Sequence, residues 1–177
     1  MKMSDDVLVL GLGNPIMADD GVGLAALERL RARFVVPTGV ELADGGTWGM
    51  RLLPMIEDHD RVLFLDAIDH GDPAGTLIRL EGDAIPRGIG MGKLSPHQVD
   101  LQDVLAAAAL RGRLPREMVA LGLQPELIEM RVGLTPVVEA GLDKLVLAAV
   151  ECLAAWGMPC HPADLHGDAH LMHGSAP

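Results

Sequence analysis

The chain has few of the residues on which several common functions depend. Four of its 177 residues are aromatic, and acidic residues outnumber basic ones by 25 to 14, for a net charge of -11. A nucleic-acid-binding surface needs basic side chains and often aromatic rings, so nucleic acid is not an expected partner. No apolar run approaches the roughly 18 residues that span a bilayer. The amino-terminal MKMSDD is unlike a secretory signal, and we expect a cytoplasmic protein with no membrane partner.

Side chains that act as nucleophiles are also scarce. The three serines are Ser4, Ser95 and Ser175, and none lies in a G-x-S-x-G nucleophile elbow. Two cysteines, Cys152 and Cys160, do not make a disulfide framework, and Cys152 falls in an apolar helical stripe that predicts a core position. The usual zinc motifs H-E-x-x-H and C-x-x-C are absent. The sequence therefore offers no obvious nucleophile.

Apolar strands alternate with amphipathic helices along the chain. This alternation predicts a three-layer α/β/α sandwich with a mostly parallel central sheet of about five strands. We expect one domain over residues 1–157 and a flexible tail over residues 158–177 that holds four of the seven histidines, with weak metal binding as its alternative role. Residues 86–94 are rich in glycine and predict a loop. The predicted strands are 7–10, 40–43, 61–66, 76–81 and 118–123, and the predicted helices are 22–30, 48–56, 95–110 and one that starts at 135.

Three potential metal ligands converge on one edge of the predicted sheet. Asp20 follows the first strand, Asp66 ends the third, and His97 lies at a helix start. Ligands bind beyond the carboxyl ends of such strands, and two carboxylates with one imidazole suit a divalent metal such as nickel or zinc. Each residue also has an ordinary explanation: Asp20 could cap a helix, Asp66 could bond backbone amides, and His97 could be a plain first-turn residue. Asp44, at the end of the second strand, points to the same edge.

Five short motifs occur in order along the chain. They are GLGNPIMADDGVG at 11–23, DGGTWG at 44–49, LDAID at 65–69, KLSPHQ at 93–98 and GLTPVVEA at 133–140. Each motif is weak alone, whereas all of them in this order are highly specific. Together they resemble the nickel–iron hydrogenase maturation endopeptidases, and the similarity covers roughly residues 5–156.

This resemblance implies a monomeric, cytoplasmic, metal-dependent endopeptidase. Such an enzyme removes the C-terminal extension of a hydrogenase large-subunit precursor after nickel insertion. The family's metal-contacting residues fall on Asp20, Asp66 and His97, and the first of these is often glutamate in relatives. The DGG motif, which begins at Asp44, is implied to shape the substrate cleft. We expect the nickel to arrive with the substrate, so that only a loaded precursor is recognised.

The role of the nickel in catalysis stays open at this point. It could activate the attacking water as a Lewis acid. If it only docks the precursor, Asp44 or one of the ligand carboxylates would be the general base.

Other functions fit part of the sequence. GLGNP also opens the peptidyl-tRNA hydrolases, but those enzymes need a histidine soon after the motif and a basic face, and here the first histidine is His59. The same turn lacks the third glycine of a dinucleotide fingerprint, because Ile16 replaces it, so no nucleotide cofactor is expected. A nickel-binding chaperone or docking factor without protease activity would use the same three ligands, and a cleavage assay would distinguish it from a protease.

Overall fold

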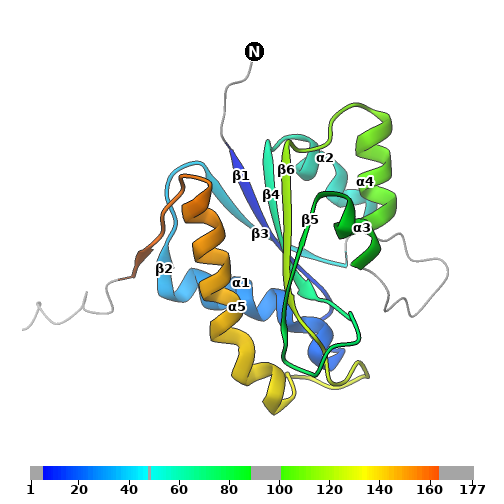
Figure 1. The fold of residues 1–177 in the computed structure, drawn as a ribbon, viewed down its shortest axis with the longest axis vertical. Helices are drawn as coiled ribbons and strands as arrows, with labels where there is room; N and C mark the ends of the chain where they lie inside the picture. The colour runs from blue at the N-terminus through cyan, green and yellow to red at the C-terminus, as the bar shows by residue number, and fades with distance from the viewer. Residues whose placement is uncertain (1–5, 48, 89–100, 164–177) are drawn as a thin grey trace, which may run out of the picture.

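A five-stranded sheet in the order β3-β1-β4-β6-β5 forms the centre of the molecule (Figure 1). The computed structural model describes residues 6–47, 49–88 and 101–163. β1 pairs in parallel with β3 and β4, β4 pairs in parallel with β6, and β5 runs antiparallel to β6. The predicted, mostly parallel sheet is therefore confirmed. Its strands are β1 (Val7–Leu12), β3 (Val40–Gly46), β4 (Arg61–Ala67), β5 (Leu77–Glu81) and β6 (Glu117–Leu123).

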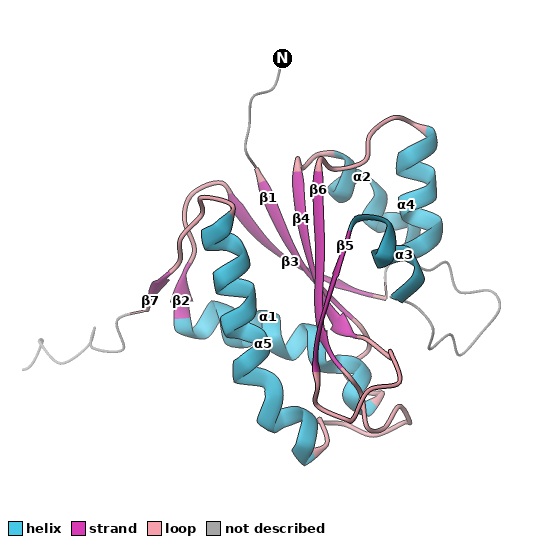
Figure 2. Ribbon diagram, viewed as in Figure 1, coloured by secondary structure: helices cyan, strands magenta, loops and turns pink. Residues whose placement is uncertain are grey.

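Helices cover both faces of this sheet (Figure 2). Because side chains alternate along a strand, Val7 and Val9 of β1 join the core under α1 and α5, whereas Leu8 and Leu10 join the core under α2, α3 and α4. The predicted three-layer α/β/α sandwich is confirmed. Of the helices in the described ranges, none has both the length and the apolar character needed to cross a membrane. The helix bounds are α1 (Val22–Arg33), α2 (Leu53–Glu57), α3 (Ile85–Gly88), α4 (Leu101–Leu110) and α5 (Pro136–Ala155).

Some predicted element boundaries were wrong. The helix predicted over 48–56 is a 3-10 turn, Gly49–Leu52, followed by α2. Pro54 lies at the start of α2, where its missing N–H does no harm, but the same residue would break a longer helix. The predicted loop also begins too early, because residues 86–88 belong to α3, and 89–94 lie outside the described residues.

A second, small sheet joins the end of the described chain to the end of α1. β2 (Phe34–Val35) pairs antiparallel with β7 (His161–Pro162), and the Ala163 N–H donates a 2.8 Å hydrogen bond to the Arg33 carbonyl oxygen. β7 thus lies in the first part of the segment predicted as a tail. Residues 164–177 lie outside the described residues, and their flexibility stays a prediction.

Candidate metal and catalytic site

The segments at the carboxyl ends of β1, β4 and β6 meet at one edge of the sheet (Figure 1). Asp20 lies in the 3-10 turn Ala18–Gly21 that follows β1, and Asp66 is the last residue but one of β4. Gly122 of β6 is the register partner of Asp66. A Cβ atom at Gly122 would lie 2.4 Å from the Asp66 carbonyl oxygen, so this close approach of two strands requires glycine.

Asp20 is held by the turn that leaves β1. Its Oδ2 atom accepts a 2.7 Å hydrogen bond from the Asn14 N–H. Gly13 has a φ of +107°, and a Cβ atom there would lie 1.8 Å from the Asp20 carbonyl oxygen, so the turn needs glycine. The helix-cap explanation of Asp20 is wrong, because the N-cap residue of α1 is Gly21, with no side-chain cap hydrogen bond. Burial raises the pKa of Asp20, and the Asn14 hydrogen bond opposes that rise.

Asp66 is buried, with 8% of its surface exposed. Its Oδ1 atom accepts a 2.8 Å hydrogen bond from the Ala67 N–H, which is the backbone contact that the sequence allowed. Loss of water around the carboxyl group raises its pKa, the charge of Asp20 raises it further, and the Ala67 bond opposes both effects. The pKa of Asp66 reaches about 8 as a result.

The buried carboxyl group of Asp66 beside the half-buried carboxyl group of Asp20 favours a cation. Because the pKa of Asp66 is about 8, Asp66 keeps its proton at neutral pH, and a divalent cation could replace that proton and bind oxygens of Asp20 and Asp66. The donor set therefore fits a metal. Within the described ranges, no group of three or more His, Cys, Asp or Glu side chains is arranged around one point. His97, the predicted third ligand, lies outside those ranges and stays a prediction.

Asp44 lies at the same edge of the sheet but on a more distant strand. It is an exposed residue of β3 and pairs in register with Gly11 of β1. The prediction that Asp44 ends its strand was wrong, because β3 continues through Gly46. Since β1 separates β3 from β4, Asp44 and Asp66 are two strands apart. The structure therefore brings Asp20 and Asp66 together, while the role of Asp44 stays a prediction.

Two buried polar residues organise the surrounding loops, and sequence reasoning gave neither of them this role. Asp19 is fully buried and bonded to the loop between β6 and α5. Gln124 is 6% exposed, and its Oε1 atom accepts hydrogen bonds of 2.8, 3.1 and 3.2 Å from the backbone of residues 70–72. Its Nε2 atom donates to Asp69 at 2.9 Å. These partners lie 52 to 116 positions away in the chain, so no local motif points to them.

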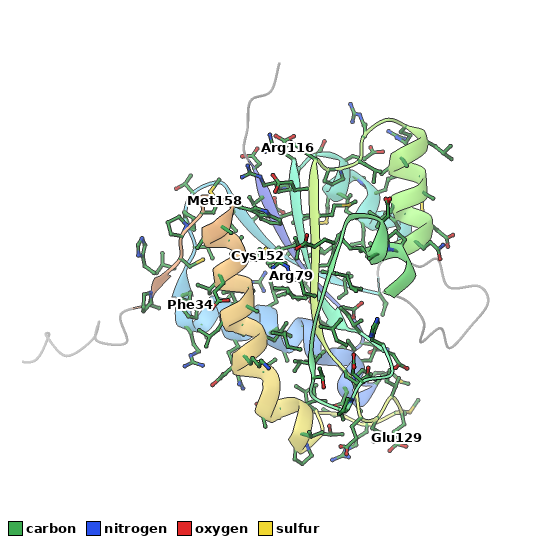
Figure 3. The ribbon with its side chains drawn as sticks, viewed as in Figure 1. Phe34, Arg79, Arg116, Glu129, Cys152 and Met158 are labelled. Atoms are coloured by element: carbon green, nitrogen blue, oxygen red, sulfur yellow. The ribbon has the colours of Figure 1, made fainter. Side chains whose placement is uncertain are left out.

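Neither cysteine is suited to act as a nucleophile. Cys152 lies on α5, with 2% of its surface exposed, where the helix faces Arg79 of β5 (Figure 3). Burial raises the pKa of the Cys152 thiol, although Arg79 opposes the rise. Burial likewise raises the pKa of the Cys160 thiol. Both thiols are therefore protonated at neutral pH, and the predicted core position of Cys152 is confirmed.

Comparison with known proteins finds one family. A family model described as hydrogenase maturation protease matches residues 24–152. The hydrogenase expression/formation protein HupD of Rhodobacter capsulatus is 41% identical over 153 residues, which cover 86% of this chain and 73% of HupD.

Solved structures agree with this match. The hydrogenase maturating endopeptidase HybD from Escherichia coli superposes with a TM-score of 0.82 at 35% identity, over 89% of this chain and 97% of that one. The [NiFe] hydrogenase maturation protease HybD from Thermococcus kodakarensis gives a TM-score of 0.63 at 29% identity, over 83% and 98%. These similarities favour the maturation proteases over the peptidyl-tRNA hydrolases.

Proposed function

The chain belongs to the hydrogenase maturation protease family, and we propose that it removes the C-terminal extension of a nickel–iron hydrogenase large-subunit precursor after nickel insertion. Membership of the family makes the protein a processing endopeptidase. The nickel–iron class of hydrogenase is supported by the T. kodakarensis relative, which is described as a [NiFe] hydrogenase maturation protease. The proposal also includes a cytoplasmic location and a monomeric state.

The observation that carries the proposal is the burial of Asp66 beside Asp20. Burial and the Asp20 charge together raise the pKa of Asp66 to about 8, which means that the folded protein holds the ionised carboxylate in an unfavourable environment. Ionisable groups in such environments gather at functional sites, because a ligand can compensate the unfavourable energy. A bound cation would neutralise both carboxylates at once.

We propose that nickel belongs to the substrate and is not a resident cofactor. Asp20 and Asp66 would offer oxygen ligands and His97 an imidazole nitrogen, and the precursor would supply the remaining ligands. This donor set suits a divalent ion of the nickel type. A precursor without nickel would meet two carboxyl groups with no cation between them, so it would bind weakly. Recognition would then depend on a metal that only a loaded precursor carries.

Hydrolysis also requires a path for one proton. The water oxygen bonds to the scissile carbonyl carbon, the C–N bond breaks, and the proton of the water ends on the leaving amine. On one route nickel polarises the water as a Lewis acid. On the other, nickel only docks the precursor, and the carboxylate of Asp44, Asp20 or Asp66 takes the proton. Asp44→Asn tests one of these assignments: if Asp44 is the base, the variant binds the loaded precursor normally but does not cleave it.

Exposed apolar side chains beside the acids support a protein as the substrate. Ile16 is 51% exposed, Met130 83% and Val132 81%. They lie on two segments joined by a 3.0 Å hydrogen bond from the Arg131 N–H to the Ile16 carbonyl oxygen. Apolar groups that gather on a fixed surface are typical of protein interaction sites. Since Ile16 lies in the same loop as Asp20, this surface could contact the precursor next to the cleavage site.

A processing assay with paired substrates tests the proposal. The purified protein is mixed with nickel-loaded or nickel-free large-subunit precursor, and the intact mass of the precursor is followed. We expect loss of the C-terminal extension in the loaded sample alone. Cleavage of both precursors would contradict recognition through nickel, and binding without cleavage would favour the nickel-binding docking factor.

A further inference from the structure

Asp19 joins two loops that are far apart in the sequence. Its side chain is fully buried. Its Oδ2 atom accepts hydrogen bonds from the Glu126 N–H at 3.0 Å, the Leu127 N–H at 3.0 Å and the Thr135 hydroxyl at 2.9 Å. Its Oδ1 atom accepts a 2.7 Å bond from the Thr135 N–H. One carboxylate thus ties the turn before α1 to the segment that leads into α5.

The backbone beside Asp19 is tied to the same segment. The Ala18 N–H donates to the Arg131 carbonyl oxygen at 2.7 Å, and the Asp19 N–H donates to the Leu127 carbonyl oxygen at 3.1 Å. Figure 1 shows these two segments, blue before α1 and yellow before α5, together at the lower end of the molecule.

Ala18 has an unusual backbone conformation. Its φ of +50° makes it the one non-glycine residue with a positive φ in the ranges that the structure describes. An L-residue with a side chain disfavours this region, so the contacts around Ala18 must hold it there. The Asp19 carboxylate, bonded four times to the facing loop, is the strongest of these contacts.

Asp20 follows directly in the same turn. Its N–H donates to the Met17 carbonyl oxygen at 3.2 Å, and its carboxylate reaches the Asn14 N–H. We propose that Asp19 is a positioning residue, which holds the turn so that the Asp20 carboxylate faces Asp66. The Asp19 side chain is fully buried and all four of its hydrogen bonds are to the segment before α5, so we assign it no direct contact with the metal or the substrate. The consequence for cleavage rests on the function proposed above for Asp20.

The direct test measures amide hydrogen exchange at Asn14 in the metal-free, full-length protein. The Asn14 N–H bonds to the Asp20 carboxylate, so its protection reports where that carboxylate lies. Exchange at Asn14 is expressed relative to that of Val9 in β1, which corrects for global unfolding. In Asp19→Asn an amide group replaces one acceptor oxygen. We expect the ratio of the Asn14 exchange rate to the Val9 exchange rate to rise at least about tenfold.

Three further variants separate positioning from general stability. Leu153→Ala removes a fully buried side chain near the other end of α5 and lowers stability without touching the turn. It should not raise the ratio, because global destabilisation speeds exchange at Val9 at least as much as at Asn14. Thr135→Val removes only the hydroxyl donor and should give a smaller rise, so the test holds even if Asp19→Asn does not fold. Adding Ala18→Gly to Asp19→Asn should partly restore the ratio, because glycine tolerates a positive φ.

The outcomes are distinct. An unchanged ratio in Asp19→Asn, or an equal rise in Leu153→Ala, would overturn the positioning role. The kcat/KM for cleavage of nickel-loaded precursor should fall in the same variants whose Asn14 amide loses protection. If the wild type does not cleave that precursor, the proposed function fails, while the exchange at Asn14 still decides the role of Asp19.

Discussion

The Asp66 carboxyl group lies close enough to Asp20 for the Asp20 charge to raise its pKa, in addition to the larger effect of burial. The two acids come from different strand ends of the sheet, and the fold holds them together although the Asp20 charge opposes the ionisation of Asp66. Such an arrangement lowers stability, and sites that lower stability are commonly sites of function. The predictions below follow from this pair and from the surface around it.

Stability should fall as the pH rises from about 4 to about 8. The ordinary pKa of 3.8 applies to Asp66 in the unfolded chain, whereas the folded protein keeps this proton up to a pKa of about 8. Between these values the folded state binds the extra proton, so the free energy of unfolding decreases with rising pH. One group contributes at most about 1.4 kcal/mol per pH unit. Urea unfolding at several pH values should show that Asp66→Asn lacks this decrease and exceeds the wild type in stability at neutral pH. The same pH dependence in both proteins would assign it to other groups.

Nickel should stabilise the folded protein against heat. A ligand at 100 times its Kd that binds only the folded state adds about 2.7 kcal/mol to the free energy of unfolding. The gain should be larger at pH 8 than at pH 5.5, because Asp66 must lose its proton to bind the metal. Thermal unfolding with nickel or with a chelator measures the gain, which should disappear in Asp20→Asn. The control is Asp143→Asn, an exposed acid paired with Arg29 and Arg33. A full gain in Asp20→Asn would place the metal elsewhere.

Charged substitutions on the exposed apolar surface should weaken precursor binding. Met130→Glu and Val132→Glu change side chains that are 83% and 81% exposed, so the free energy of unfolding should stay within about 0.5 kcal/mol of the wild type. We expect the KM for the nickel-loaded precursor to rise several-fold with little change in kcat, because binding and not chemistry is affected.

The matched control for this surface is Leu110→Glu. Leu110 is 91% exposed at the end of α4, where the chain leads to the start of β6 at the opposite edge of the sheet. Leu110→Glu should leave the KM for the nickel-loaded precursor unchanged. Equal effects of all three substitutions would rule out a specific docking surface.

Removal of residues 164–177 should leave cleavage unchanged. A longer deletion, of residues 158–177, also removes β7 and the contact of Met158 with the core, so it should lower the melting temperature. Even then we expect cleavage activity below that temperature to be largely kept, because Asp20 and Asp66 lie outside the small sheet that this deletion removes. Processing assays on both truncated proteins check this. Loss of activity in the shorter deletion would assign a role to the histidines of the tail.

The sheet was predictable from local patterns. β1 is buried at every position, and its apolar run indicates a strand with both faces covered. The convergence of Asp20 and Asp66 was also predictable, because the carboxyl ends of parallel strands meet at one edge whatever the details of packing.

Contacts between distant residues were not predictable in this way. The carboxylate of Asp19 bonds to residues 107 to 116 positions away, and an acid at a helix start looks the same whether it caps that helix or joins another loop. The end of β3 was misjudged for a related reason. Asp44 and the glycines after it are typical of turns, but pairing with β1 keeps them in the strand through Gly46.

The most direct test of the central claim compares nickel-loaded and nickel-free precursor as substrates of the wild type and Asp66→Asn, with Asp143→Asn as the control. Intact mass gives the rate of shortening, and affinity measurements give precursor binding. The wild type and the control should cleave only the loaded precursor, and Asp66→Asn should remain folded, bind it less tightly and cleave neither. Normal, nickel-dependent cleavage by Asp66→Asn would contradict the claim that Asp20 and the buried Asp66 recognise the metal.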